Sequence, residues 1–310
     1  MVNELWVIKY QPKTIQDYVF RDDRQKNQVK SWIEAGVTPH LLFSGVQGIG
    51  KTSLAQLILK QLGIPSADIL ELNASDDNSV DVIRQKVSNF VGVMPFGDFR
   101  YVFLDEADYL TLNAQAILRG LMEKFAATSR FILTCNYEHK IIPALKSRCQ
   151  GFHLTQLDRG DFDVRAATIL VAEGVEFDLE TLDTYVRATY PDLRKCINSL
   201  QQNSTTGRLE LPDEKDIAGE ADYKLQMVEL FKAGQINKAR KLVCSQARPE
   251  EFEDIYKFLY QNLELWGNER KQEEAILIIR DGLCNHAICA DGEINLAACL
   301  VQLANLVEGK

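Results

Sequence analysis

The spacing of apolar and polar residues divides the chain into two parts. Four short apolar runs, at 40–44, 69–72, 101–104 and 131–134, alternate with segments whose apolar residues recur at helical spacing. Strands that are buried on both faces read as continuous apolar runs, so this alternation predicts an α/β domain with a parallel sheet covered by helices on both faces. Beyond Phe152 we expect no further strands, because the remaining pattern is helical.

The second part has helical periodicity throughout. Residues 158–173 and 178–202 have helical patterns, and the polar, turn-rich stretch 203–207 reads as a linker. We therefore predict an α/β domain over 1–153, a small helical segment over 154–206 and an all-helical domain over 212–310. Within the last, Gly234 is predicted to end a helix, and two apolar helix faces follow from Tyr223, Met227, Leu230 and Phe231, and from Phe252, Ile255, Leu259, Leu263 and Trp266.

The end of the chain is more apolar than an ordinary surface helix. From Ile294 to Val307 apolar residues occupy more than one face of the predicted helix. A helix of this kind is buried on several sides. We expect it to pack against other helices, either of this chain or of other subunits.

Polar residues follow each of the four apolar runs. They are Gly45–Thr52, Asn73–Asp77, the pair Asp105 and Glu106, and Thr134–Asn136. In a parallel sheet these four loops meet at one edge, where ligands of such sheets bind. The sequence therefore predicts a binding site at the carboxyl ends of the strands.

The first of these loops reads GVQGIGKT, which matches G-x-x-x-x-G-K-[ST]. Its glycines allow backbone N–H groups to converge on phosphate oxygens, Lys51 adds a cation, and the Thr52 hydroxyl is suited to Mg²⁺. The helix that follows directs its positive end at the same anion. We therefore expect a nucleotide-phosphate site formed by Gly45, Val46, Gln47, Gly48, Ile49, Gly50, Lys51, Thr52 and Ser53.

Two acids end the third apolar run. Asp105 can hold a metal ion or its water, and Glu106 is placed to polarise an attacking water, which hydrolysis requires beyond nucleotide binding. The alternative is that 105–108 is a solvated acidic helix start, favoured by the helix dipole. The phosphate-binding loop upstream favours the catalytic interpretation.

Composition and charge restrict the class of protein. A hydrophobic content of 46% and a charged content of 25% fit a soluble globular chain. No apolar run approaches the roughly 20 residues that span a bilayer, and residues 1–12 lack the apolar core of a signal peptide, so we expect a cytoplasmic or, in a eukaryote, nuclear protein. The net charge of −9 argues against attraction of nucleic acid by the whole surface, so DNA binding would need a few positioned cations or several copies of the chain.

The seven cysteines lack paired spacing and are best read as reduced thiols. The one local cluster, Cys284, His286 and Cys289, could hold a metal or could pack in a helical core. Its apolar helical context favours core packing.

Six segments together resemble one family, the clamp-loader ATPase subunits, meaning replication factor C small subunits and the large subunit of T4-like phage clamp loaders. The resemblance covers about residues 5–200. Its motifs are WVIKYQP at 6–12, ELNASDD at 71–77, DEAD at 105–108, CNY at 135–137, PALKSRC at 143–149 and PDLR at 191–194. The chain departs from the family at Gln11, where an arginine is usual, and at Val46 and Gln47, where prolines are common.

The resemblance implies an AAA+ nucleotide-binding domain, a helical lid that carries the sensor 2 motif, and a helical collar that mediates oligomerisation. It implies an ATPase that uses Mg²⁺ and works in a pentameric loader made of copies of itself and a distinct subunit. ATP binding and hydrolysis would open a sliding clamp and place it on primer–template DNA during replication. The alternatives are a non-hydrolysing nucleotide switch that serves as a scaffold, or another AAA+ DNA remodeller.

The resemblance also assigns roles to residues around the phosphates. Asn136 would hold the attacking water, and Arg194 on the lid would contact the phosphates. Arg148 of the S-R-C motif would act in trans on the ATP of a neighbouring subunit; the alternative is a surface arginine beside a turn. The adenine end of the pocket would be formed by Val7, Ile8, Lys9, Tyr10 and Val19, which could instead be a strap over the sheet edge.

Further roles concern DNA and the clamp. Gln115 would couple the DNA-facing helix to the acidic pair, or else be a solvated helix residue. Arg84 and Arg119, with Lys86 near them, match positions that meet the DNA backbone, although each could be an ordinary surface cation. The apolar residues Met94 and Phe96 would help dock the sliding clamp, or would lie in a buried loop.

Overall fold

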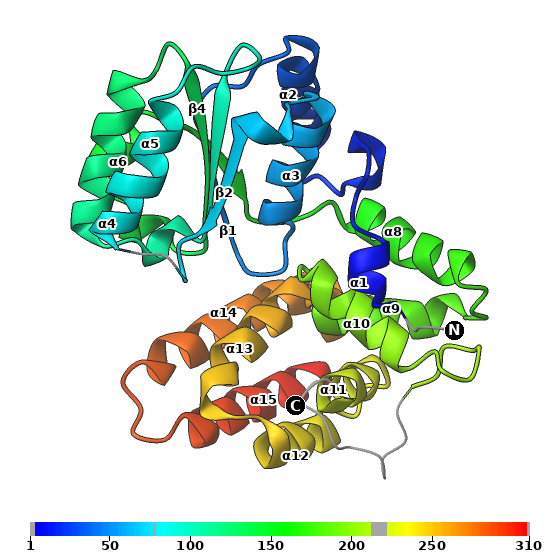
Figure 1. Ribbon diagram of the computed structural model, residues 1–310. Coiled ribbons are helices and arrows are strands. Elements are labelled where there is room, and N and C mark those ends of the chain that lie inside the picture. The colour runs from blue at the N-terminus through cyan, green and yellow to red at the C-terminus, as the bar shows by residue number, and fades with distance from the viewer. Residues whose placement is uncertain (1–3, 77–78, 212–221, 309–310) are drawn as a thin grey trace. The chain divides into compact units, whose positions relative to one another are not determined.

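The structure is a computed structural model that describes residues 4–76, 79–211 and 222–308. The chain forms two compact units, one of residues 1–169 and 191–198, the other of residues 170–190 and 199–310 (Figure 1). Asp77 of the ELNASDD motif and the predicted collar start at residue 212 lie outside the described residues. The domain boundaries drawn from the sequence remain a prediction.

The first unit contains the predicted parallel sheet. Its strands lie in the order β2-β3-β4-β1-β5, and every neighbouring pair is parallel. The strands are β1 (Leu41–Gly45), β2 (Ile69–Asn73), β3 (Arg100–Asp105), β4 (Ser129–Cys135) and β5 (Gln150–Leu154). The prediction of a parallel α/β sheet is therefore confirmed.

The expectation that strands stop at residue 152 is wrong, because β5 continues to Leu154. This edge strand pairs only with β1. Its Phe152 and Leu154 are buried, whereas the intervening His153 is exposed. An edge strand with one solvated side alternates between polar and apolar residues, so it lacks the continuous apolar run by which the four inner strands were recognised.

Helices cover both faces of the sheet (Figure 1). One face carries α2 (Asp23–Glu34) and α3 (Lys51–Gln61), and the other carries α4 (Val80–Val82), η3 (Ile83–Val87), α5 (Ser88–Val91) and α6 (Leu112–Lys124). Leu42, Val102 and Leu133 belong to a core shared with α6. The intervening Leu41 and Phe43 of β1 are also fully buried, which fits strands enclosed on both sides.

The first unit also contains short elements, which precede the first strand or connect the strands. Two of them, η4 and η5, follow the ends of β3 and β4, where the predicted site lies. The short elements are α1 (Trp6–Lys9), η1 (Ile15–Asp17), η2 (Ser66–Asp68), η4 (Ala107–Tyr109), η5 (Glu138–Lys140) and α7 (Pro143–Lys146).

The helical prediction for residues 158–202 is confirmed, with one more break than expected. The helices are α8 (Arg159–Ala172), α9 (Leu179–Thr189) and α10 (Leu193–Gln202). The break falls at Pro191, since the residue before a proline is disfavoured in the helical region. Helices α8 and α10 each contribute residues to both units.

The second unit is helical in all its remaining described elements. They are α11 (Asp222–Lys232), α12 (Ile236–Gln246), η6 (Pro249–Glu251), α13 (Phe252–Gln261), η7 (Leu263–Trp266), α14 (Glu269–His286) and α15 (Gly292–Glu308). Met227, Phe231, Phe252 and Trp266 lie in one core, as their spacing predicts. Gly234 follows α11 with a φ of 68°, which confirms it as a helix stop.

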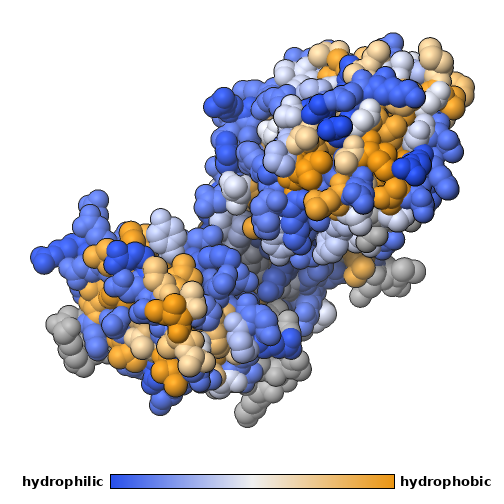
Figure 2. Space-filling model, turned by 90° about the vertical axis from the view of Figure 1, so that its left-hand side faces the viewer, coloured by the Kyte–Doolittle hydropathy of each residue, from blue (hydrophilic) through white to orange (hydrophobic). Residues whose placement is uncertain are grey.

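The last helices bury one face and expose apolar residues on another. In α15, Leu296, Leu300 and Leu303 are buried, whereas the exposed fractions of Ile294 and Val301 are 67% and 39%. Hydrophobic side chains gather in patches on the molecular face that Figure 2 presents. The expected burial of α15 on several faces is thus confirmed for one face only, which packs against other helices of the same unit.

The cysteine cluster near the end of α14 differs from its prediction. Cys284 and Cys289 are exposed, so the expected core packing is wrong for both, whereas the half-buried His286 packs against the core residues Phe252 and Tyr256. Cys284 lies on the solvated side of α14, and Cys289 lies in the turn that follows this helix. The prediction was wrong because it relied on the apolar residues that surround both cysteines in the sequence. No group of residues suited to a metal ion occurs in the described parts of the chain.

Candidate nucleotide-binding site

The phosphate-binding loop connects β1 to α3, and its backbone requires glycine at two points. Gly50 is the amino-terminal cap of α3 with φ +93°, and a Cβ there would lie 3.1 Å from the Tyr18 ring. Gly48 has φ +76°, and a Cβ there would lie 1.9 Å from an Asp192 oxygen. A side chain at either position would have a strained backbone, and at Gly48 it would also collide with Asp192. The loop leads directly into α3, whose positive end is suited to an anion.

Lys51 lies in the first turn of α3 and is buried. Its ammonium donates to the carbonyls of Gly45 at 2.9 Å and Val46 at 2.8 Å, and to Asn136 Oδ1 at 2.7 Å. Burial lowers the pKa of Lys51, while the nearby groups of Cys135 and Asp105 act in the opposite direction. Two motifs 85 residues apart thus meet at a single ammonium group.

Thr52 and Asp105 also lie together. The Thr52 hydroxyl donates to both carboxylate oxygens of Asp105 at 2.9 Å, and the Thr134 hydroxyl donates to Oδ1 at 2.5 Å. A hydroxyl at the start of α3 and a carboxylate at the end of β3 fit Mg²⁺, which takes oxygen ligands and keeps several waters. Thr134 was expected at this edge of the sheet but without a role of its own, although its place directly before the CNY motif was a usable signal.

Glu106 has an unusual backbone conformation. Its φ of 55° and ψ of 42° are left-handed, and it is the only residue other than glycine with positive φ in the described ranges. Its N–H donates to the Thr134 hydroxyl at 2.9 Å, which helps to hold this conformation. A strained residue at the position predicted to polarise water is typical of functional sites.

Asp108 holds the loop that carries Asn136. It is almost fully buried, and its two oxygens accept the N–H groups of Asn136 at 3.3 Å and Tyr137 at 3.1 Å. The alternative of a solvated acidic helix start therefore does not describe Asp108. Sequence reasoning gave this carboxylate no role of its own, although it belongs to the DEAD motif.

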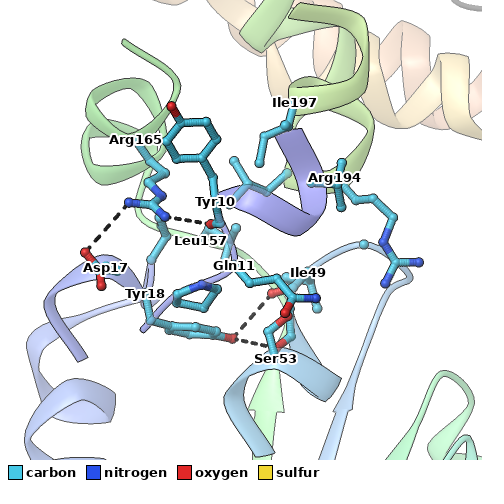
Figure 3. A pocket seen from close by; sticks show the side chains of 16 residues that line it. Tyr10, Gln11, Asp17, Tyr18, Ile49, Ser53, Leu157, Arg165, Arg194 and Ile197 are labelled. Atoms are coloured by element: carbon cyan, nitrogen blue, oxygen red, sulfur yellow. Dashed lines mark hydrogen bonds and ion pairs between the residues drawn. The ribbon is translucent and has the colours of Figure 1, made fainter. Parts of the chain in front are cut away.

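A pocket opens beside the phosphate-binding loop and is drawn in Figure 3. It is lined by Val7, Tyr10, Gln11, Pro12, Asp17, Tyr18, Val19, Gly48, Ile49, Gly50, Ser53, Leu157, Arg165, Leu193, Arg194 and Ile197. Three of the five residues predicted for the adenine end, Val7, Tyr10 and Val19, line this pocket. The other two, Ile8 and Lys9, lie outside it with exposed side chains.

The sequence did not predict Tyr18 or Arg165 as pocket residues. The Tyr18 hydroxyl donates to the carbonyls of Ile49 and Gly50 at 3.4 Å (Figure 3). Burial raises the pKa of Tyr18, so the hydroxyl stays a proton donor. Its neighbour Val19 was the available signal for Tyr18.

Arg165 on α8 ties this helix to the amino-terminal segment. Its guanidinium donates to the Tyr10 carbonyl at 2.8 Å and lies 3.9 Å from an Asp17 oxygen (Figure 3). No motif marks Arg165, so only the folded arrangement reveals it. The result is one wall of the pocket that depends on residues far apart in sequence.

The first turn of α10 forms another wall. Arg194 lines the pocket, as the PDLR motif predicts. Asp192 accepts the N–H of Lys195 at 2.9 Å and packs against Gly48. Burial raises the pKa of the Asp192 carboxyl. The segment at the start of α10 therefore contacts the phosphate-binding loop directly.

Arg148 does not line this pocket. It follows α7, and its guanidinium donates to the Ala144 carbonyl at 2.5 Å, to Ser147 Oγ at 3.3 Å and to a carboxylate oxygen of Glu123 on α6. The side chain is 31% exposed. All these partners lie on α6, α7 or the turn after α7, so the structure does not bring Arg148 to the nucleotide site of its own chain.

Gln115 on α6 is buried and fully hydrogen-bonded. Its amide donates to the carbonyls of Leu110 and Lys140 at 3.1 Å and accepts the N–H of Ile142 at 2.9 Å. Its exposed fraction is 1%, so the alternative of a solvated helix residue is wrong. Gln115 connects the segment after the acidic pair to the segment between Asn136 and Arg148.

The predicted surface residues are exposed. Arg84 and Lys86 lie on η3, which packs against α6, and Arg119 lies on α6 itself. Met94 and Phe96 have exposed fractions of 76% and 80%, so the alternative of a buried loop is wrong.

Comparisons with known proteins agree with this arrangement. The family model described as "ATPase family associated with various cellular activities (AAA)" matches residues 41–157. The replication factor C small subunit of Sulfurisphaera tokodaii is 37% identical over 97% of this chain and 95% of its own length. That of Thermofilum pendens is 34% identical over 98% of this chain and 97% of its own length.

Solved structures with a similar fold include a RuvB protein of Thermotoga maritima. The TM-score is 0.58 and the identity 16%, and the match covers 83% of this chain and 91% of that chain. At this identity the likeness shows the AAA+ fold alone. No helix in the described parts of the chain is long and apolar enough to cross a membrane.

Proposed function

Because this chain belongs to the replication factor C small-subunit family of AAA ATPases, we propose that it is an ATP-hydrolysing subunit of a sliding-clamp loader. The observation that carries the proposal is the meeting of Lys51 and Asn136 beside the Thr52 and Asp105 pair. The segments that follow three strands, β1, β3 and β4, supply a phosphate-binding ammonium, a water-positioning amide and oxygen ligands for a metal. This is the set that phosphoryl transfer requires.

The proposed reaction is attack of water on the γ-phosphorus of ATP. Glu106 orients the water and accepts its proton, the bond from the γ-phosphorus to the β–γ bridging oxygen breaks, and ADP and phosphate are released. Asn136 holds the water, and Lys51 neutralises charge on the phosphate oxygens. Mg²⁺ held by Thr52 and Asp105 would supply further positive charge at the phosphates.

We assign the missing positive charge to Arg148 of a neighbouring subunit. Within the described residues its guanidinium is hydrogen-bonded to α6, α7 and the turn after α7, and it does not line the pocket. An arginine provided in trans typically accelerates such reactions by ~10³ to 10⁵. The active unit would therefore be an oligomer of copies of this chain with a distinct subunit, arranged as a pentamer.

We propose that DNA stimulates turnover through Arg84, Lys86 and Arg119. Their exposure on the neighbouring elements η3 and α6 suits contacts with a phosphate backbone, which fix position rather than read sequence. Gln115 lies on the same helix as Arg119 and contacts the segments after Glu106 and after Asn136. It would transmit DNA binding to the hydrolytic residues.

The apolar side chains of Met94 and Phe96 are proposed to dock the sliding clamp. Two large apolar residues that are more than three-quarters exposed favour a partner surface. Replacing both with serine should abolish stimulation by the clamp while sparing nucleotide binding.

The central test is turnover of ATP by the assembled complex with clamp and primed DNA. Glu106→Gln should retain ATP binding and lose hydrolysis, because the amide cannot accept the water's proton. Turnover of the Glu106→Gln complex at the normal rate would refute the role of Glu106. Absence of turnover in the wild-type complex would favour a non-hydrolysing switch.

A further inference from the structure

The segment 92–98 between α5 and β3 combines exposed apolar side chains with an anchored backbone. Val93, Met94 and Phe96 are 57%, 76% and 80% exposed. A loop that is ordered only upon docking pays conformational entropy at that moment and binds more weakly. The backbone of this segment is instead bonded to two buried charged residues, Asp68 and Arg100.

Asp68 is the last residue of η2 and has an exposed fraction of 0%. Its two carboxylate oxygens accept the N–H of Phe96 at 3.0 and 2.9 Å, and Oδ2 also accepts the N–H of Gly97 at 2.8 Å. Two backbone donors of an exposed loop are thus satisfied by one carboxylate of the interior. Hydrogen bonds to a charged group are stronger than those between neutral groups.

Arg100 begins β3 and is 6% exposed. Its guanidinium donates to the Phe90 carbonyl at 2.9 Å and to the Met94 carbonyl at 3.2 Å, and it lies 4.6 Å from the centre of the Phe90 ring. Its Nε lies 3.6 Å from Asp68 Oδ1. Because Phe90 is in the last turn of α5, the guanidinium joins the end of that helix to the segment.

We propose that Asp68 and Arg100 are positioning residues that hold segment 92–98 in the conformation in which Met94 and Phe96 bind the sliding clamp. The inference rests on the docking role in the proposed function. A buried ion pair is weak evidence for stability, because apolar residues of similar volume often serve as well. Fixing one conformation is the better-attested use of buried charges, and here their backbone partners include Met94 and Phe96 themselves.

The size of the effect follows from the bonds involved. Losing one hydrogen bond to a buried carboxylate costs about 1.5 kcal/mol, which corresponds to about a tenfold weaker interaction if it is needed for binding. The clamp concentration that gives half-maximal stimulation of ATP turnover should therefore rise about tenfold. Turnover without the clamp should stay within about twofold, because no residue of the nucleotide site is touched.

Gly97 offers a matched pair of variants. Gly97→Pro removes the N–H that donates to Asp68, whereas Gly97→Ala keeps it, and the nearest atom to the added Cβ would be 3.7 Å away. Asp68→Asn is the second perturbation and weakens both amide bonds at once. If Asp68→Asn does not fold, the Gly97 pair still tests the inference.

Two readouts are needed, and both use the full chain. Hydrogen exchange of the Phe96 amide should be slow in the wild-type chain and in Gly97→Ala, and faster in Gly97→Pro. Clamp titration of the assembled complex should show the raised half-maximal concentration in Gly97→Pro but not in Gly97→Ala.

Each result of these experiments either supports or contradicts the positioning role of Asp68 and Arg100. Fast Phe96 exchange in the wild-type chain would overturn the positioning role itself. Faster exchange in Gly97→Pro with an unchanged clamp titration would show that positioning does not serve docking. If the clamp still stimulates a Met94→Ser, Phe96→Ser variant, the docking proposal fails and this inference fails with it, whatever the exchange data show.

Discussion

The strained backbone of Glu106 leads to an unusual prediction, in which removing the side chain that we propose to orient the attacking water stabilises the fold. Glu106 has φ 55° and ψ 42°. The left-handed conformation costs an L-residue about 1–2 kcal/mol, whereas it costs glycine no steric energy. Glycine in turn loses about 0.5–1 kcal/mol of backbone entropy on folding. The midpoints of these two ranges differ by about 0.75 kcal/mol, so Glu106→Gly should raise the free energy of unfolding by about that amount while abolishing hydrolysis.

The comparison is made with Glu106→Gln, which keeps the strained backbone and also loses hydrolysis. Urea unfolding of each chain gives the midpoint and slope, and equal slopes allow the midpoints to be compared. Ala116→Gly is the control, because Ala116 is an exposed residue inside α6 and should lose about 1 kcal/mol. If Glu106→Gly is no more stable than Glu106→Gln, the backbone at this position stores no strain and the reasoning is refuted.

Three further changes test the surroundings of the site. Asp108→Asn should lower kcat for ATP about tenfold with little change in KM, because an amide in place of this carboxylate weakens the bonds to the Asn136 loop by about 1–2 kcal/mol. An unchanged kcat in steady-state assays would contradict this prediction. Gln115→Met should lower thermal stability by about 1–3 kcal/mol, since the Ile142 N–H is left without an acceptor, and calorimetry showing no loss would disprove it. Burial raises the pKa of Asp192, so the folded state holds this proton more tightly than the unfolded state. The stability that the proton contributes at low pH should be lost as pH rises from the ordinary carboxyl pKa of 3.8 through the folded pKa, and the pH–stability curve of Asp192→Asn should lack this loss.

Sequence patterns predicted the structural features that depend on residues close together in the chain. The inner strands, the phosphate-binding loop and the Gly234 helix stop are local features, and all three occur as expected. Strand β5 was missed because its buried and exposed residues alternate, so it has no continuous apolar run. Such a strand is partly exposed to solvent, and the order of residues alone does not reveal this exposure.

The contents of the site were only partly predictable for a different reason. Asn136 and Lys51 were found through motifs, but the contact between them spans 85 residues and depends on the sheet order. Tyr18 and Arg165 carry no motif and act through backbone carbonyls, which any sequence supplies. Such residues become visible only when distant segments are brought together.

The three hydrogen-bond partners of the Lys51 ammonium are two carbonyls and an amide, none of which carries a charge. They orient the cation without neutralising it, so its attraction extends to any polyphosphate, whatever group that polyphosphate bears. Discrimination among nucleobases must then arise from other residues that line the cavity, such as Tyr10 and Arg165. Inorganic triphosphate should accordingly compete with ATP for this loop, and changes near Tyr10 should alter the choice of base while leaving that competition intact.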